Sequence, residues 1–185
     1  MIYINSLLRS TTLFAAETMY NVTEKEYRII ERIDEDMMRR VFKTGRGCAI
    51  YQLYLESGQL PARFVIKRMK LIFLHYILTR EEESLMFRFL MAQRNDPTKG
   101  DWYSDVSKIL EEFEINLKIE DLKNVPGNKF KRIVKQKTKI AGFKYLKCQQ
   151  EKCEKGSRIK YDCLELQDYL NLAEKYLNRR AKIYI

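Results

Sequence analysis

The sequence predicts an all-α protein, an irregular helical bundle with room for two small helical subdomains. Apolar side chains recur every three or four residues over most of the chain, the spacing of an α-helix, and strand-like alternation never lasts more than a few residues. Only seven glycines and three prolines occur among 185 residues, too few for a sheet rich in tight turns. With 45% apolar residues, the chain has enough nonpolar side chains to fill a core.

Local start and stop signals place the helices in order. Thr23 and Glu26 have the spacing of a capping box, so we expect a helix to begin there and to end at the glycines at 45 and 47. Gly58 is expected to end a short helix, and Pro61 to open a long one. The segment 5–20 is helix-compatible, and the helices expected after it cover 24–44, 49–56, 62–79, 81–94, 102–113, 119–123, 127–147 and 162–170. The helix at 81–94 is expected to carry three glutamates in its first turn, where the helix dipole favours acids.

Turn-forming residues are dense from Asn95 to Asp101, so we expect a loop or joint at 96–101. This joint divides the chain into a first helical region at 1–95 and a second at 102–170. A tail at 171–185 follows, for which the sequence makes no structural prediction.

Positive charge is concentrated in one part of the chain. The stretch 126–160 contains twelve Lys or Arg and two acids, a surplus of ten, which equals the net charge of the whole protein. The rest of the chain is balanced, with 23 cations and 23 acids. A concentration of positive charge in one segment favours a polyanionic partner. Cations that neutralise phosphates release the counterions of the polyanion, and the affinity gained in this way does not depend on nucleotide sequence. The expected partner is therefore the phosphate backbone of RNA or DNA.

The helix expected at 127–147 separates its charges from its apolar residues when it is drawn at 100° per residue. One arc is apolar and consists of Phe130, Ile133, Val134, Ile140, Ala141 and Tyr145. The opposite arc carries the candidate phosphate contacts, which are Lys131, Arg132, Lys135, Lys139 and Lys147. A Lys-rich helix face that is merely solvated is the common alternative, and the run at 129–139 also suits a nuclear import signal.

Residues with catalytic or metal-binding chemistry do not form a convincing set. Cys148, Cys153 and Cys163 lack a fourth ligand nearby, so they are interpreted as ordinary thiols rather than a zinc site. His75 lies in an apolar helix and is expected to be a hydrogen-bonded core residue. Consecutive acids on a helix diverge by 100°, so the acidic clusters do not converge on one metal. We therefore expect no catalytic residues, no metal and no cofactor.

The expected location is the nucleus or the cytoplasm. Four cysteines without a regular framework are typical of reduced thiols, and the N-terminus has no basic leader. The longest apolar run, Met69–Leu78, is interrupted by a lysine and a histidine and is too short to span a bilayer. No membrane partner is expected.

Several short strings occur in a recognisable order. They are Ala16–Thr23, Tyr54–Glu56 with Gly58, Pro61 with Arg63 and Phe64, Leu74–Leu78, Phe89–Gln93, Asn95–Pro97 and Gly100–Trp102. Together they resemble the region downstream of the polymerase palm in proteins encoded by non-LTR (LINE-type) retrotransposons of animals. The resemblance covers about Ser6 to Leu170.

The resemblance implies a thumb-like region at 1–95 and a linker-like region at 102–170, which in that family hold template and primer. It also implies partners among the other parts of a retroelement protein. A polymerase palm needs a Tyr/Phe-x-Asp-Asp signature and a further Asp to hold two metal ions, and this chain has no adjacent Asp-Asp pair. The resemblance therefore implies a non-catalytic part of such a protein.

The predicted function is that of a non-catalytic, nucleic-acid-binding helical segment. One alternative is a helical protein-interaction module that docks through the apolar arc of the basic helix. Another is a degenerate retroelement fragment without a selected function. Salt-dependent binding to nucleic acid separates the first of these from the other two.

Overall fold

The computed structural model of the chain describes residues 9–45, 47–96, 100–117 and 119–152, and within them it is helical and contains no strand, which confirms the all-α prediction. In chain order the elements are α1 (Arg9–Thr12), a 3₁₀-helix η2 (Ala16–Thr18), α2 (Glu24–Val41), α3 (Ile50–Ser57), α4 (Ala62–Leu78), α5 (Leu85–Asn95), α6 (Trp102–Glu112), α7 (Ile119–Asn124) and α8 (Gly127–Lys152). The helix predicted at 162–170 and the tail at 171–185 lie outside the described residues.

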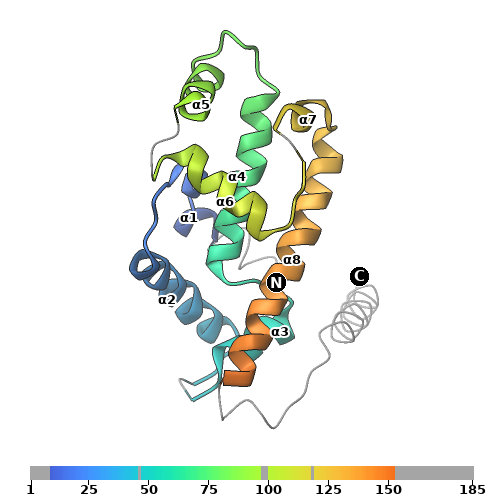
Figure 1. The fold of residues 1–185 in the computed structure, drawn as a ribbon. Coiled ribbons are helices and arrows are strands. Elements are labelled where there is room, and N and C mark those ends of the chain that lie inside the picture. Colours follow the sequence, from blue (N-terminus) through green and yellow to red (C-terminus); the bar gives the residue numbers. More distant parts are fainter. Residues whose placement is uncertain (1–8, 46, 97–99, 118, 153–185) are drawn as a thin grey trace, which may run out of the picture.

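Two long helices, α4 and α8, run side by side through the molecule (Figure 1). The shorter α6 crosses α4, α2 and α3 lie at one end of the pair, and α5 and α7 lie at the other. Because α4 contacts α2, α5, α6, α7 and α8, its residues are buried on several sides, as its broad apolar pattern requires.

Capping residues fix several helix ends where they were predicted. The Thr23 hydroxyl accepts from the Glu26 backbone N–H, and the Glu26 carboxylate accepts from the Thr23 backbone N–H, which completes the capping box. Gly58 ends α3 in the left-handed conformation, with φ 64°, and Pro61 precedes the first residue of α4.

Three predicted helix ends are wrong. Helix α8 continues to Lys152, past its predicted end at 147. Helix α2 ends at Val41 rather than at the glycines, because Lys43 itself takes the left-handed conformation (φ 51°) and the Thr44 N–H closes the turn on the Arg39 carbonyl. Helix α5 begins at Leu85 rather than at Glu81, because the Ser84 hydroxyl accepts from the Phe87 N–H. A side-chain cap thus sets the start of α5, and the three glutamates precede the helix.

The largest buried apolar cluster joins α4, α5, α6 and α8, so it includes residues from both sides of 96–101. Its fully buried members include Leu71 and Leu74 of α4 and Phe130 of α8. A second cluster forms where α3 meets the C-terminal half of α8, around Tyr54 and Leu146. The division of the chain at 96–101 stays a prediction.

None of the helices in the part of the chain that the structure describes is both long enough and apolar enough to cross a membrane.

Candidate nucleic-acid interface

The buried residues of α8 follow a four-residue step. They are Phe130, Val134, Thr138, Gly142, Leu146 and Gln150. Four residues turn an α-helix through about 400°, so each step moves the buried stripe about 40° around the helix axis. The stripe winds in this way because α8 packs first against α4 and then against α3.

The winding stripe corrects the predicted apolar arc. Phe130 and Val134 are buried as expected, but Ile140 is 58% exposed. The position facing the core at this level is Gly142, where a Cβ would lie 2.5 Å from the Leu60 Cδ2 atom. Ile133, Ala141 and Tyr145 are half-buried. A fixed arc at 100° per residue therefore fails over a helix that changes its packing partner along its length.

The predicted phosphate contacts lie beside and opposite the buried stripe. Four of the five follow one another at multiples of four residues in a row that winds around α8 beside the buried stripe, and we refer to them as the lysine line: Lys131, Lys135, Lys139 and Lys147. Lys131, Lys135 and Lys147 are exposed, and Lys139 is half-buried. The fifth, Arg132, is exposed on the outer face of the helix, three residues before Lys135.

These five cations lack an acid partner within ion-pairing distance in the described chain. None of the five forms an ion pair with any residue that the structure describes. The Lys139 ammonium lies 5.5 Å from the centroid of the Phe143 ring, and burial followed by the nearby charge of Lys135 lowers the pKa of Lys139. Within the described residues, the ion pair that α8 makes is a long one, 3.9 Å between Lys137 and Glu114. The field of α8 is therefore largely uncompensated.

One further cation belongs to this region and was missed by the sequence interpretation. Arg68 of α4 is half-buried, lines the same pocket as Lys135 and Lys139, and has no acid partner in the described chain. The signal in the sequence was the basic run at 67–70, but Lys67 and Lys70 of that run pair with acids on α6. Only the tertiary arrangement distinguishes Arg68 from its neighbours.

The remaining candidates for catalysis or metal binding are His75 and the cysteines. His75 is buried, its Nε2 atom lies 2.8 Å from the Val125 carbonyl oxygen, and its ring stacks on Phe130, which confirms it as a core residue. Among the described residues no group of three or more His, Cys, Asp or Glu is placed to hold a metal ion. Cys148 is an exposed thiol, and Cys153 and Cys163 lie outside the described residues.

Comparisons with known proteins give no relative: no family model, no curated protein and no solved structure matches the chain. Functional inference therefore depends on the chemistry of its own residues.

Proposed function

We propose that the chain is a non-catalytic, nucleic-acid-binding helical segment, similar to the thumb and linker of a retrotransposon-encoded reverse transcriptase. The observation that carries this proposal is the lysine line, a row of cations that winds around α8 and has no acid partners in the described chain. Ordinary solvated helix faces mix both signs of charge, whereas α8 has nine Lys or Arg and one Glu.

The length of the lysine line suits a polymer rather than a single anion. From Lys131 to Lys147 the helix rises about 24 Å at 1.5 Å per residue. One nucleic-acid strand advances about 3.4 Å per phosphate in a duplex, so the line spans about seven nucleotide steps. Lysine ammonium groups bind phosphate as point charges and read no bases, so the binding is expected to be insensitive to sequence.

A second candidate function, that of a protein-interaction module, has its own observation. Leu85, Met86 and Phe89 of α5 are 83%, 49% and 61% exposed, an apolar surface that a partner helix would cover. The apolar arc of α8 is less suited to docking than the sequence indicated, because Phe130 and Val134 are already buried inside this fold.

The test replaces all four residues of the lysine line with glutamine and measures binding to a fluorescein-labelled single strand by anisotropy at several salt concentrations. Each lost phosphate contact flattens the log–log salt slope by about 0.7–0.9, so the slope should flatten by about three. Circular dichroism checks that the variant is folded.

A matched control removes the same amount of charge from an exposed part of α2 and the turn after it. It replaces Lys25, Arg32, Arg40 and Lys43 with glutamine. We expect the control to keep nearly the wild-type slope, because these residues belong to α2 and the turn after it rather than to α8. An unchanged slope in a folded lysine-line variant, or an equal change in the control, would refute the phosphate interpretation of α8.

A further inference from the structure

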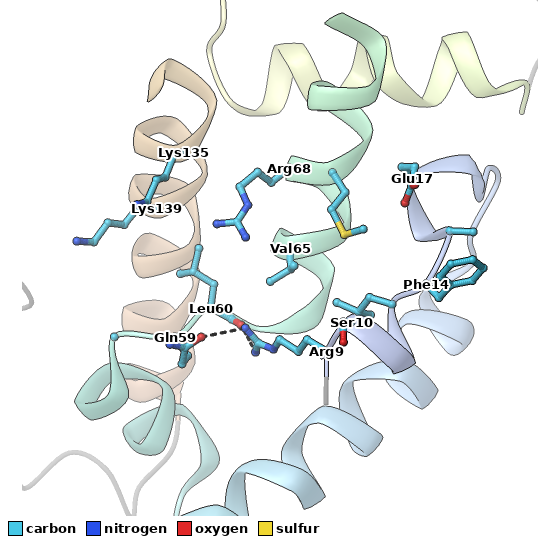
Figure 2. A pocket seen from close by; sticks show the side chains of 14 residues that line it. Arg9, Ser10, Phe14, Glu17, Gln59, Leu60, Val65, Arg68, Lys135 and Lys139 are labelled. Carbon is cyan, nitrogen blue, oxygen red and sulfur yellow. Dashed lines mark hydrogen bonds between the residues drawn. The ribbon is translucent and has the colours of Figure 1, made fainter. Parts of the chain in front are cut away.

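A pocket of about 770 Å³ opens between α1, η2, the turn before α4, α4 itself and α8. We call it the cationic pocket, because its charged lining residues are Arg9, Arg68, Lys135 and Lys139 with a single acid, Glu17. Figure 2 shows that these residues come from elements far apart in the sequence, with Arg68 extending from α4 toward α8. The size is that of a small-ligand site, which is commonly 300–1,000 Å³ in proteins.

Arg9 is a structural part of the pocket rather than a free charge. It is 5% exposed, and its guanidinium donates to both carboxylate oxygens of Asp34, at 2.8 and 2.7 Å. It also donates to the Gln59 side-chain oxygen at 3.1 Å and to the Leu60 carbonyl at 2.7 Å. Its charge is compensated, and it holds the turn before α4 in place.

The other three cations are not compensated by any residue in the described ranges. Arg68 and Lys139 are half-buried, so each loses part of its hydration without gaining an acid. Burial lowers the pKa of Arg68, and the neighbouring Arg9 lowers it further. A cluster of like charges that is partly withdrawn from water is unfavourable for the free protein and becomes favourable when an anion enters.

Glu17 gives the pocket a second kind of binding group. Its Oε2 atom is buried and has no hydrogen-bond partner among the described residues. Figure 2 places Glu17 on the other side of the pocket from Lys135 and Lys139. A buried carboxylate oxygen without a donor is costly, so it calls for an N–H or O–H group from a ligand. Phe14 also lines the pocket and is 85% exposed, which leaves its ring free for stacking.

We propose that the cationic pocket binds one nucleotide of a single strand, with the phosphate held by Arg68, Lys135 and Lys139 and an N–H or O–H of the nucleoside bound to Glu17. This inference rests on the proposed function and narrows it from any polyanion to a strand with an accessible nucleotide. The phosphates of a duplex lie on a convex surface with their bases stacked inside, so a duplex cannot place a nucleoside beside Glu17.

The first experiment compares Arg68→Gln with Arg132→Gln, a matched control that removes one positive charge from the outer face of α8. The probes are a fluorescein-labelled 12-nucleotide single strand, with and without a 5′-phosphate, and the corresponding duplex. Arg68→Gln should weaken single-strand binding about tenfold, as expected for the loss of a charge-assisted contact, and should weaken duplex binding no more than the control does. A greater loss with the 5′-phosphorylated strand identifies a terminal nucleotide, and equal losses identify an internal one.

The second experiment uses the direction in which the binding affinity changes. Glu17→Gln removes a negative charge, so long-range electrostatics alone would strengthen binding to any polyanion. In our proposal the variant loses a strong acceptor, and single-strand affinity falls while duplex affinity does not. Stronger single-strand binding by Glu17→Gln would overturn the proposed orientation. Equal effects of Arg68→Gln and Arg132→Gln on both probes would overturn the pocket assignment.

Two further measurements separate this inference from the proposed function and from a folding defect. If Arg68→Gln is unfolded by circular dichroism, Arg68→Lys takes its place, because it keeps the charge and loses the planar fork. If the wild-type chain binds neither probe, the proposed function has failed. A thermal shift with adenosine monophosphate that Arg68→Gln abolishes then assigns the pocket to a free nucleotide, and no shift refutes the pocket itself.

Discussion

Helices α4 and α8 lie side by side and both are rich in Lys and Arg. Most cations of α4 have acid partners in the described chain, whereas most cations of α8 do not. On α4, cations meet acids from the two helices beside it. The pairs are Arg63 with Glu24 and Glu31, Lys67 with Glu112, and Lys70 with Asp105. On α8, the lysine line has no acid partner in the described chain. The exception on α4 is Arg68, which faces the pocket it shares with α8.

This difference shows that a run of basic residues cannot be assigned to folding or to binding until the acids that pair with it are known. The cations of α4 are part of the fold, because α2 and α6 present carboxylates to them and the pairs are partly or fully buried. Among the cations of α8, those of the lysine line form no ion pair with a described residue. They increase repulsion within the free protein, and a polyanion would relieve it.

The largest expected effect is the loss of an acid on the α4 side. Lys70 is fully buried and donates to Asp105, so Asp105→Ala leaves a buried ammonium unpaired. We expect this variant to lose about 3–5 kcal/mol of unfolding free energy, measured by urea denaturation. Adding Lys70→Met should restore much of the loss, because the uncompensated charge is removed. A loss below about 1 kcal/mol for Asp105→Ala would mean that Lys70 is not buried as described.

A smaller effect is expected at Arg63, whose guanidinium donates to Glu31 at 2.7 Å and to Glu24 at 2.9 Å. Arg63→Met should cost about 1–3 kcal/mol in urea denaturation, the range for hydrogen bonds to charged groups. The hydrogen bond from Arg63 lowers the pKa of Glu24. Ionised Glu24 therefore stabilises the fold above the glutamate pKa of the unfolded chain, and this contribution disappears as the pH falls through the lower folded pKa.

The pH dependence gives Arg63→Met its own control. The variant should lose less stability than the wild type between neutral and acidic pH, because Glu24 no longer has a depressed pKa. The Glu24 carboxyl, followed by NMR, should titrate at higher pH in Arg63→Met. An unchanged Glu24 titration would show that the pair does not form in solution.

The smallest effects are expected on the α8 side. Single replacements of Lys131, Lys135 or Lys147 by glutamine should change the unfolding free energy by no more than about 0.5 kcal/mol, because each side chain is exposed and lacks an acid partner in the described chain. Urea denaturation at low salt measures this. A loss of unfolding free energy above about 1 kcal/mol would show that this lysine has a partner and that α8 does not differ from α4 in this respect.

Features determined by neighbouring residues were predictable from the sequence. The capping box at Thr23 and the left-handed Gly58 depend on contacts within one turn, and both were correct. The start of α5 was wrong because two local signals competed there and the Ser84 cap prevailed. Segregated charge likewise indicated the basic helix before any packing was known.

Features that depend on packing were not predictable in the same way. Gly142 faces Leu60 across a gap too small for a Cβ, and nothing in the sequence near Gly142 identifies that neighbour. Arg68 differs from Lys67 and Lys70 only in which helix it faces. A regular helical projection also assumes a single packing direction, whereas α8 changes its partner from α4 to α3.

The four-residue step of the lysine line has a mechanical consequence. Each step turns the line about 40° around α8, so Lys147 lies about 160° around the axis from Lys131. Double-stranded DNA is stiff over about 150 base pairs, so a straight duplex laid along α8 meets one part of the line and leaves the rest behind the helix. A chain without that stiffness can curl around α8 and touch every lysine in turn. The winding of the lysine line around α8 therefore favours flexible polymers over stiff ones, whatever their sequence.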